Sequence, residues 1–164
     1  MAKKFLLLFI TIVMVSCGSD DNSTDLDCSL VLCAAVDDTI YLQFLHPDND
    51  EDLLKNGTIN VDLIEIINED SNEVTFTVEE FSEMGVYLAI PVSTTSFGQK
   101  SFTITLDEDE SFNINFETSL PQDNDDCCGG YTTLESFTID NYSYDLVEPS
   151  SLPVLTTVYI PNLD

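Results

Sequence analysis

The chain is poor in basic residues. Lys and Arg together number 4 among 164 residues, whereas Asp and Glu number 31, which gives a formal net charge of −27 at pH 7. A field of this sign repels nucleic acid and anionic lipid headgroups. The composition therefore excludes nucleic acid as a partner and makes cations the natural counterions of the protein.

Residues that usually carry catalysis are also scarce. His46 is the only histidine, and no Gly-x-Ser-x-Gly nucleophile elbow is present to pair with it in a Ser-His-Asp triad. Tryptophan is absent, which removes the strongest platform for stacking a sugar, although 6 tyrosines can substitute. Two carboxylates suffice for a glycoside hydrolase, but 31 acidic residues single out no pair. We therefore expect no enzyme, with a carboxylate-based glycoside hydrolase as the alternative.

The apolar run at the start of the chain is too short to span a bilayer. Residues 5–15 form an uncharged run of 11 residues, whereas a membrane-spanning helix needs about 20. The run follows Lys3 and Lys4 and ends at small residues beginning with Ser16, which is the three-part order of an export signal. Residues 1–16 are therefore predicted to be a cleaved signal peptide.

The end of this signal carries a lipidation motif. Residues 14–17, Met-Val-Ser-Cys, resemble the lipobox of bacterial lipoproteins, in which the cysteine thiol receives a diacylglyceryl group before the signal is removed. The resemblance makes Cys17 the lipidated first residue of the mature chain. Each buried acyl CH₂ contributes about 0.8 kcal/mol, so several chains give stable anchoring. A lipid anchor in a membrane is therefore expected.

The segment after the cysteine predicts a tether and an address. Residues 17–27 hold the lipidated cysteine and an acidic stretch with almost no apolar side chains, which is typical of a flexible linker. Residues 18–22, Gly-Ser-Asp-Asp-Asn, resemble the export signal that sends lipoproteins of Bacteroidota to the outer face of the outer membrane. We expect the protein there, exposed at the cell surface. Loss of the signal leaves Lys55 and Lys100 against all 31 acidic residues, a formal charge of about −29.

The cysteines predict disulfides. With Cys17 lipidated, Cys28, Cys33, Cys127 and Cys128 remain, an even number in an exported protein. A bridge between the adjacent late cysteines would close a strained ring, so we expect each early cysteine to pair with a late one, in either combination. The first such closure stabilises by up to about 4.7 kcal/mol in the chain-entropy model. A zinc site or redox pair is the alternative, which the spacing disfavours.

The rest of the chain alternates apolar and polar residues with a period of two, and no stretch has helical spacing. The clearest unit is a hairpin in which residues 102–106 and 112–116 flank an acidic turn, with Phe102, Phe112 and Phe116 as core residues. The pattern predicts that residues 28–164 form one all-β domain, an antiparallel immunoglobulin-like β-sandwich of about seven to nine strands, with a small β-barrel as the alternative. The strands are expected near residues 40–45, 59–67, 74–78, 86–90, 102–106, 112–116, 131–139, 142–147 and 154–160.

One acidic loop is a candidate for Ca²⁺, which prefers oxygen ligands. Asp48, Asp50 and Asp52 alternate along it, but Leu53 and Ile59 stand where an EF-hand loop needs Gly and Glu. The loop is therefore no EF-hand. We expect no cofactor other than this possible Ca²⁺, and a solvated turn is the simpler interpretation.

A second short motif concerns modification. Residues 38–40, Asp-Thr-Ile, resemble the acceptor of O-glycosylation in Bacteroidota, which implies a glycan on Thr39. The alternative is that Thr39 simply begins a strand.

The whole layout resembles small surface lipoproteins of Bacteroidota of the flavobacterial type. It combines the lipobox, the acidic tether, an early cysteine pair, Asp-Leu-Leu at residues 52–54 and a late Cys-Cys. The resemblance brings no activity with it. We expect a non-enzymatic binding or accessory module of the cell envelope with a protein or glycan partner. The alternatives are a calcium-stabilised adhesion module and a carboxylate-based hydrolase.

Overall fold

The computed structural model describes residues 35–107, 110–120, 131–146, 150–161 and 163. The chain divides into two compact units, residues 1–32 and 33–164, and every described residue belongs to the second. The predicted signal peptide, the tether and all five cysteines lie outside the described residues, so their predictions are not tested.

The described residues form nine strands and one short 3-10 helix, and their alternating apolar residues account for the strands. In chain order these elements are β1 (Thr39–Leu45), η2 (Val61–Leu63), β2 (Glu65–Asn68), β3 (Thr77–Phe81), β4 (Gly85–Pro91), β5 (Gly98–Asp107), β6 (Glu110–Ser119), β7 (Thr133–Ile139), β8 (Ser143–Leu146) and β9 (Val154–Tyr159).

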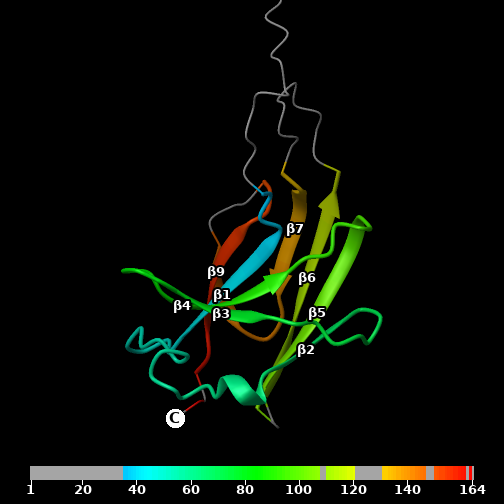
Figure 1. Ribbon diagram of the computed structural model, residues 1–164. Helices are drawn as coiled ribbons and strands as arrows, with labels where there is room; N and C mark the ends of the chain where they lie inside the picture. Colours follow the sequence, from blue (N-terminus) through cyan, green and yellow to red (C-terminus); the bar gives the residue numbers. More distant parts are fainter. Residues whose placement is uncertain (1–34, 108–109, 121–130, 147–149, 162, 164) are drawn as a thin grey trace, which may run out of the picture. The chain divides into compact units, whose positions relative to one another are not determined.

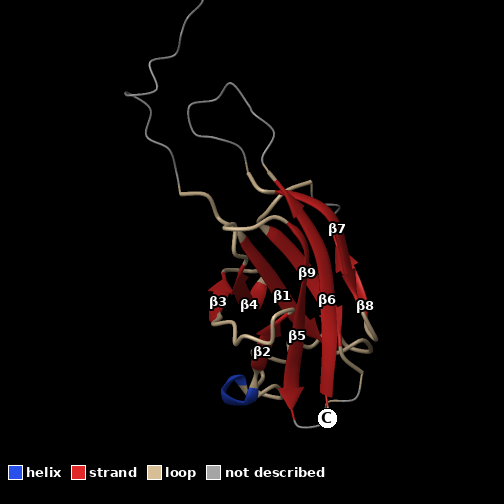
Figure 2. Cartoon of the chain, turned by 90° about the vertical axis from the view of Figure 1, so that its right-hand side faces the viewer, coloured by secondary structure: helices blue, strands red, loops and turns tan. Residues whose placement is uncertain are grey.

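The strands form two separate sheets (Figures 1 and 2). One sheet has five strands in the order β3-β4-β1-β9-β8, and the other has four in the order β2-β5-β6-β7. The predicted β-sandwich is therefore confirmed, with nine strands in its described part. The barrel alternative is wrong, because the sheets do not close on one another.

One strand pair departs from the predicted antiparallel arrangement. Strands β1 and β9 run parallel, with Ile40 opposite Val154 and Leu45 opposite Tyr159, whereas the other strand pairs of the described residues are antiparallel. The two strands lie side by side in Figure 1. A period of two tells which face a side chain takes, but it is blind to the direction of the neighbouring strand, so the alternation could not predict this pair.

The predicted strand at residues 59–67 is wrong in its first half. The side chain of Asn60 accepts a hydrogen bond from the backbone N–H of Asp62 at 3.1 Å and caps the 3-10 helix η2, the blue element of Figure 2. An Asn that bonds its own backbone competes with strand pairing, so the extended segment begins only at Glu65. Ile59 is nevertheless buried, and it enters the core from a turn.

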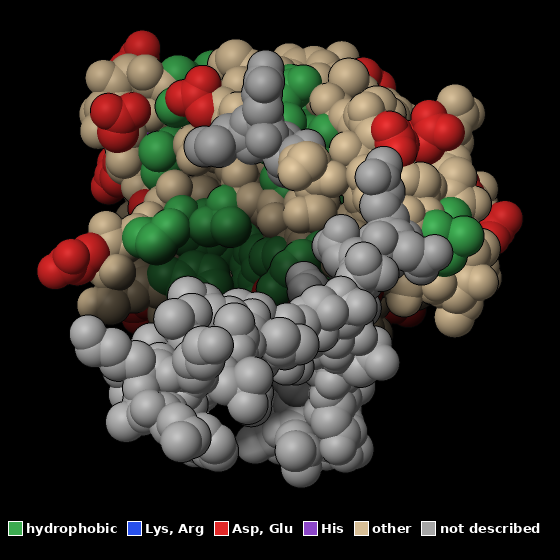
Figure 3. All heavy atoms as spheres, turned by 90° about the horizontal axis from the view of Figure 1, so that it is seen from above, with side chains coloured by type: hydrophobic (Ala, Val, Ile, Leu, Met, Phe, Trp, Pro, Cys, Tyr) green, Lys and Arg blue, Asp and Glu red, His purple; other side chains and the backbone are tan. Residues whose placement is uncertain are grey.

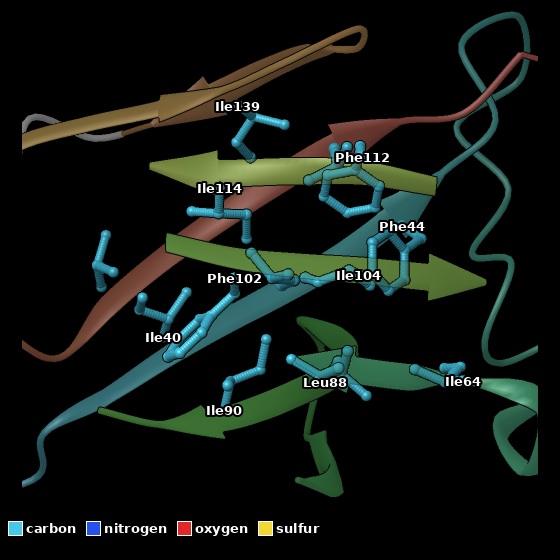
Figure 4. Packing of buried hydrophobic residues seen from close by; sticks show 14 of the residues in the cluster. Ile40, Phe44, Ile64, Leu88, Ile90, Phe102, Ile104, Phe112, Ile114 and Ile139 are labelled. Carbon is cyan, nitrogen blue, oxygen red and sulfur yellow. The ribbon is translucent and has the colours of Figure 1, made fainter. Parts of the chain in front are cut away.

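The core lies between the two sheets and contains the residues that the hairpin pattern predicted. Phe102, Phe112 and Phe116 are buried. The ring of Phe112 packs edge to face against the ring of Phe44 from the other sheet, with the ring centroids 6.3 Å apart (Figure 4). Burial of a large apolar side chain contributes roughly 1.5–3 kcal/mol. The sandwich therefore depends on these side chains from both layers.

Strand β1 is buried on both of its faces. Ile40, Leu42 and Phe44 are fully buried in the core, while Tyr41 and Gln43 point to the other side of the sheet and are each only 9% exposed. Strand alternation alone would leave these two in solvent. Their burial shows that other groups cover part of the outer face of the five-stranded sheet.

Candidate functional site

The outer face of the five-stranded sheet carries a groove of about 830 Å³. We call this surface the outer groove. Its floor and walls come from strands β4, β8 and β9, the turn before β4 and the segment before β9. The lining residues are Met84, Tyr87, Asp145, Leu146, Ser150, Ser151, Pro153, Val154, Leu155, Thr156 and Thr157.

A cluster of aromatic rings forms one part of this face. Phe81 lies edge to face between Tyr41 and Tyr87, with ring centroids 5.5 Å and 5.3 Å apart. The Tyr41 hydroxyl donates a hydrogen bond to Asp37 Oδ2 at 2.9 Å. Burial is the main cause that raises the pKa of Tyr41 and of Tyr87, and nearby carboxylates add to it. Both rings are therefore neutral parts of a packed wall.

The turn that carries Met84 is held by a small polar network. Asp52 Oδ2 accepts hydrogen bonds from the backbone N–H of Val86 at 2.9 Å and from Gln43 Nε2 at 3.5 Å. Gln43 Nε2 also donates to the carbonyl of Met84 at 2.9 Å. Gly85 has a φ of +113°, which a residue without a Cβ adopts readily. The backbone of the turn is thus fixed, while the Met84 side chain stays 51% exposed at the edge of the outer groove.

This network gives Asp52 a structural role that the other two predicted calcium ligands do not share. The Asp52 carboxylate is directed to the backbone of β4, and its Oδ1 accepts from the N–H of Lys55 at 3.0 Å. In the described part of the chain, no three His, Cys, Asp or Glu side chains form a group that could hold a metal ion, and this includes Asp48, Asp50 and Asp52. The structure therefore does not bring these three together, and Ca²⁺ binding stays a prediction.

His46 directly follows β1 and stands at the start of the loop that carries Asp48, Asp50 and Asp52. Its Nδ1 accepts from the N–H of Asp48 at 3.3 Å, and its own N–H donates to the carbonyl of Glu51 at 2.9 Å. These bonds close the turn. They give His46 a structural role at the end of β1.

Thr39 is the first residue of β1 and is half-buried opposite Pro91 of β4. The expectation that it begins a strand is confirmed. Its O-glycosylation stays a prediction.

The outer face of the four-stranded sheet carries a second hollow, of about 400 Å³. We call it the polar trough. It lies over the neighbouring strands β5, β6 and β7, and Glu69, from the turn after β2, accepts a hydrogen bond from the N–H of Ser101 at 3.3 Å. Its lining consists of Glu69, Gln99, Lys100, Ser101, Asn115, Phe116, Ser136 and Thr138.

The side chains that face into the trough are mostly neutral hydrogen-bonding groups. Lys100 of β5 and Phe116 of β6 are paired in register, and alternation along the two strands turns both to the face that carries the core. Asn115 Nδ2 donates to Asp140 Oδ2 at 3.3 Å, and Thr138 Oγ1 donates to the carbonyl of Asn115 at 3.5 Å. These bonds hold the amide and hydroxyl groups in fixed positions on rigid strands.

The end of the sandwich where β6 ends and β7 begins forms a third surface, which differs from the outer groove and the polar trough. Seen from above, hydrophobic side chains gather near the middle of the described part of this end, and carboxylates lie toward its margin (Figure 3). Across the described residues, no helix has the length and apolarity needed to cross a membrane.

Taken together, fold and surfaces define a nine-stranded β-sandwich with two hollowed outer faces, one apolar and one polar. No protein-family model matches the chain, and no curated protein or solved structure is significantly similar to it. The indications of function therefore lie in the surfaces themselves.

The sequence did not predict either hollow. Alternation implied that Ser101, Asn115 and Thr138 face solvent, but it did not show that they meet across three strands. The aromatic cluster was missed because Tyr41 and Tyr87 occupy the polar phase of their strands. Tyrosine in that phase, in two strands, is the signal that could have indicated a covered outer face.

Proposed function

We propose that the protein is a non-enzymatic, lipid-anchored binding module of the outer-membrane surface and that its polar trough holds a neutral carbohydrate. The observation that carries this proposal is that five of the eight residues lining the trough have uncharged hydroxyl or amide side chains, with Glu69 and Lys100 as the two charged ones, in a chain whose formal charge is −27. Hydroxyl and amide side chains from three neighbouring strands are gathered there, whereas carboxylates are spread along most of the chain.

Neutral hydroxyl and amide groups match the hydrogen-bonding chemistry of sugars. Each can both donate and accept, as a sugar hydroxyl does, so a bound sugar can replace the hydrogen bonds of the water that it displaces. Ser101, Asn115 and Thr138 stand on paired strands, which limits the conformational entropy lost on binding. The high negative charge of the chain disfavours anionic polymers. A neutral glycan is the ligand that satisfies both conditions.

The trough is better suited to binding than to hydrolysis. Glycoside hydrolases use two carboxyl groups on either side of the scissile bond. Glu69 is the one carboxylate among the trough-lining residues that the structure describes, and its Oε2 already accepts from the N–H of Ser101. Glu117 pairs in register with Gln99 and Ser136, but it is not among the trough-lining residues that the structure describes. We therefore favour recognition without cleavage.

Affinity electrophoresis of the detergent-solubilised mature protein tests the proposal. Gels contain one neutral polysaccharide each, a β-glucan, a mannan or a xylan, and at least one is expected to retard the protein. Ser136→Trp fills the trough and is expected to weaken retardation by about tenfold or more, a loss of about 1.4 kcal/mol. Thr105→Trp is the matched control, because it lies on the same outer face about 13 Å further along β5 than Ser101.

Three results contradict the proposal. The first is the absence of retardation by any of the neutral polymers. The second is an equal effect of Ser136→Trp and Thr105→Trp, which would place binding elsewhere. The third is release of reducing sugar from the retained polymer, which would show a hydrolase.

A further inference from the structure

We infer that the outer groove docks a basic peptide segment of a partner protein, one in which apolar side chains alternate with Lys or Arg. The polar trough lies on the opposite sheet, so this inference rests on different residues from the proposed function. It is carried by two features of the groove, exposed apolar side chains and a border of carboxylates.

Two apolar side chains of the groove lining are exposed to solvent. Met84 is 51% exposed and Leu155 is 38% exposed, and Pro153 and Tyr87 stand beside them in the lining. Covering apolar surface contributes about 25 cal/mol per Å². Aliphatic side chains of a ligand therefore gain free energy by entering the groove.

The charged groups around these side chains are carboxylates. Asp145 lines the groove, and Glu83 immediately precedes Met84 in the turn. Glu79 pairs in register with Tyr87. The groove lining contains no Lys or Arg among the described residues, and Lys55 of the loop after β1 has its Nζ 3.5 Å from Glu80 Oε1. A cationic ligand is therefore attracted, and salt must weaken that attraction because these charges are exposed.

Charge also argues against the other occupants. A second copy of the chain brings a further formal charge of −27, which opposes self-association. Two segments of this chain outside the described residues are acidic as well, since residues 18–27 contain four aspartates and residues 121–130 contain three, while residues 28–34 carry no charge to match the acidic border. A basic segment of another protein is the occupant that both the apolar floor and the acidic border favour.

The groove is also prepared for binding. The Met84 turn is fixed by Asp52 and Gln43, and Thr157 of the lining pairs in register with Gln43 of β1 on one side and with Asp145 of β8 on the other. A site with a fixed backbone loses little conformational entropy when a ligand binds.

Fluorescence anisotropy with a labelled nonapeptide of alternating Lys and Leu tests this inference on the detergent-solubilised mature protein. We expect saturable binding that weakens as NaCl is raised. Two companion peptides, with Ser in place of Leu and with Glu in place of Lys, are expected to bind at least about fivefold more weakly, which corresponds to about 1 kcal/mol. Equal binding of the Ser peptide would overturn the apolar part of the inference.

Matched variants locate the peptide. Met84→Ser is expected to weaken binding about fivefold, whereas Leu63→Ser, on η2 and 52% exposed, leaves it unchanged. Asp145→Asn is expected to weaken binding more than Asp140→Asn. Each of these aspartates accepts one side-chain hydrogen bond, from Tyr159 and Asn115 respectively. All four substituted side chains are exposed, so the fold is expected to be retained.

The outcomes separate the alternatives. Equal losses in Asp145→Asn and Asp140→Asn, together with no loss in Met84→Ser, would mean that the peptide follows the net charge and not the outer groove, which overturns the inference. Sedimentation of the mature protein as a dimer that Met84→Ser dissociates would assign the groove to a second copy instead. Binding of the peptide by Ser136→Trp at unchanged affinity supports the inference, and it does so whether or not the trough binds carbohydrate.

Discussion

Gly85 occupies a crowded position in the turn before β4. Its φ is +113°, and a Cβ built on it would lie 2.2 Å from Gln43 Nε2 and 2.8 Å from Asp52 Oδ2. Any side chain at this position must therefore displace the network that fixes Met84. The position needs glycine for space as well as for backbone conformation.

Gly85→Ala is expected to lower the free energy of unfolding by about 3 kcal/mol, because strain at positive φ and a steric clash add. Gly98→Ala is the matched control. Gly98 has a φ of +115° but nothing within 4 Å of a Cβ, so only the backbone strain of about 1–2 kcal/mol applies. Urea unfolding of both variants measures the difference, and equal losses would show that the contacts around Gly85 give way at little cost.

The Tyr142 hydroxyl donates a hydrogen bond to Glu110 Oε2. The Tyr142 ring packs edge to face against Phe112, with the ring centroids 5.4 Å apart. Burial, followed by the hydrogen bond and the charge of Glu110, raises the pKa of Tyr142 from 10.0 to about 12. A raised pKa means that the folded state favours the neutral phenol. Its contribution to stability is therefore complete below pH 10 and is lost as the pH rises toward 12.

A pH titration followed by phenolate absorbance is expected to show one tyrosine that ionises near pH 12. Tyr142→Phe should remove this late step, and Glu110→Gln should move it to lower pH because the carboxylate charge is gone. The stability of the unaltered protein should fall more steeply above pH 10 than that of Tyr142→Phe. A late step that persists in Tyr142→Phe would assign it to another tyrosine.

The loop after β1 and the hairpin of β3 and β4 are joined through Asp52. Its carboxylate accepts backbone N–H groups from both, Lys55 in the loop and Val86 in β4. Hydrogen bonds to a charged acceptor contribute about 1.5–3 kcal/mol each. This residue therefore fixes a wall of the outer groove from another part of the chain.

Asp52→Ala is expected to lower the free energy of unfolding by about 2 kcal/mol and to speed hydrogen exchange at the N–H of Val86. Asp48→Ala, in the same loop but exposed, is expected to change stability by less than about 0.5 kcal/mol. If Ca²⁺ instead raises the melting temperature of the unaltered protein and both variants abolish that rise, the calcium interpretation of this loop replaces the structural one.

The mature protein as a whole is expected to be held at a membrane by one residue. Cys17→Ser removes the thiol that receives the lipid and is expected to move the protein from the membrane fraction to the soluble fraction, with loss of acyl labelling. Protease added to intact cells should degrade the unaltered protein. Its full protection would place the protein on the periplasmic side, and retention of Cys17→Ser in membranes would contradict lipidation.

Net charge and cross-links act on the whole domain together. About −29 charges in the mature chain repel one another, so reduction of the cysteines is expected to lower the melting temperature most at low ionic strength, and added salt should recover part of the loss. Non-reducing peptide mapping should find Cys28 and Cys33 each joined to Cys127 or Cys128. Free thiols at these positions, or a bridge within either pair, would contradict this pairing.

Local patterns were enough to predict the class of fold and its core. The direction of a side chain in a strand follows from its own backbone, so alternation identified Phe102, Phe112 and Phe116 as core residues and the domain as a β-sandwich. It failed where a side chain offered the backbone another partner, as Asn60 does before η2.

The candidate sites could not be predicted in the same way, because they depend on which strands become neighbours. Leu155 shares a sheet face with Tyr41 only because β9 pairs with β1 in this register, although the two residues are more than a hundred positions apart in the chain. The polar trough likewise needs β5, β6 and β7 in register. Strand order and register come from the packing of the two sheets and from long-range pairing, and neither leaves a mark in the local periodicity of the sequence.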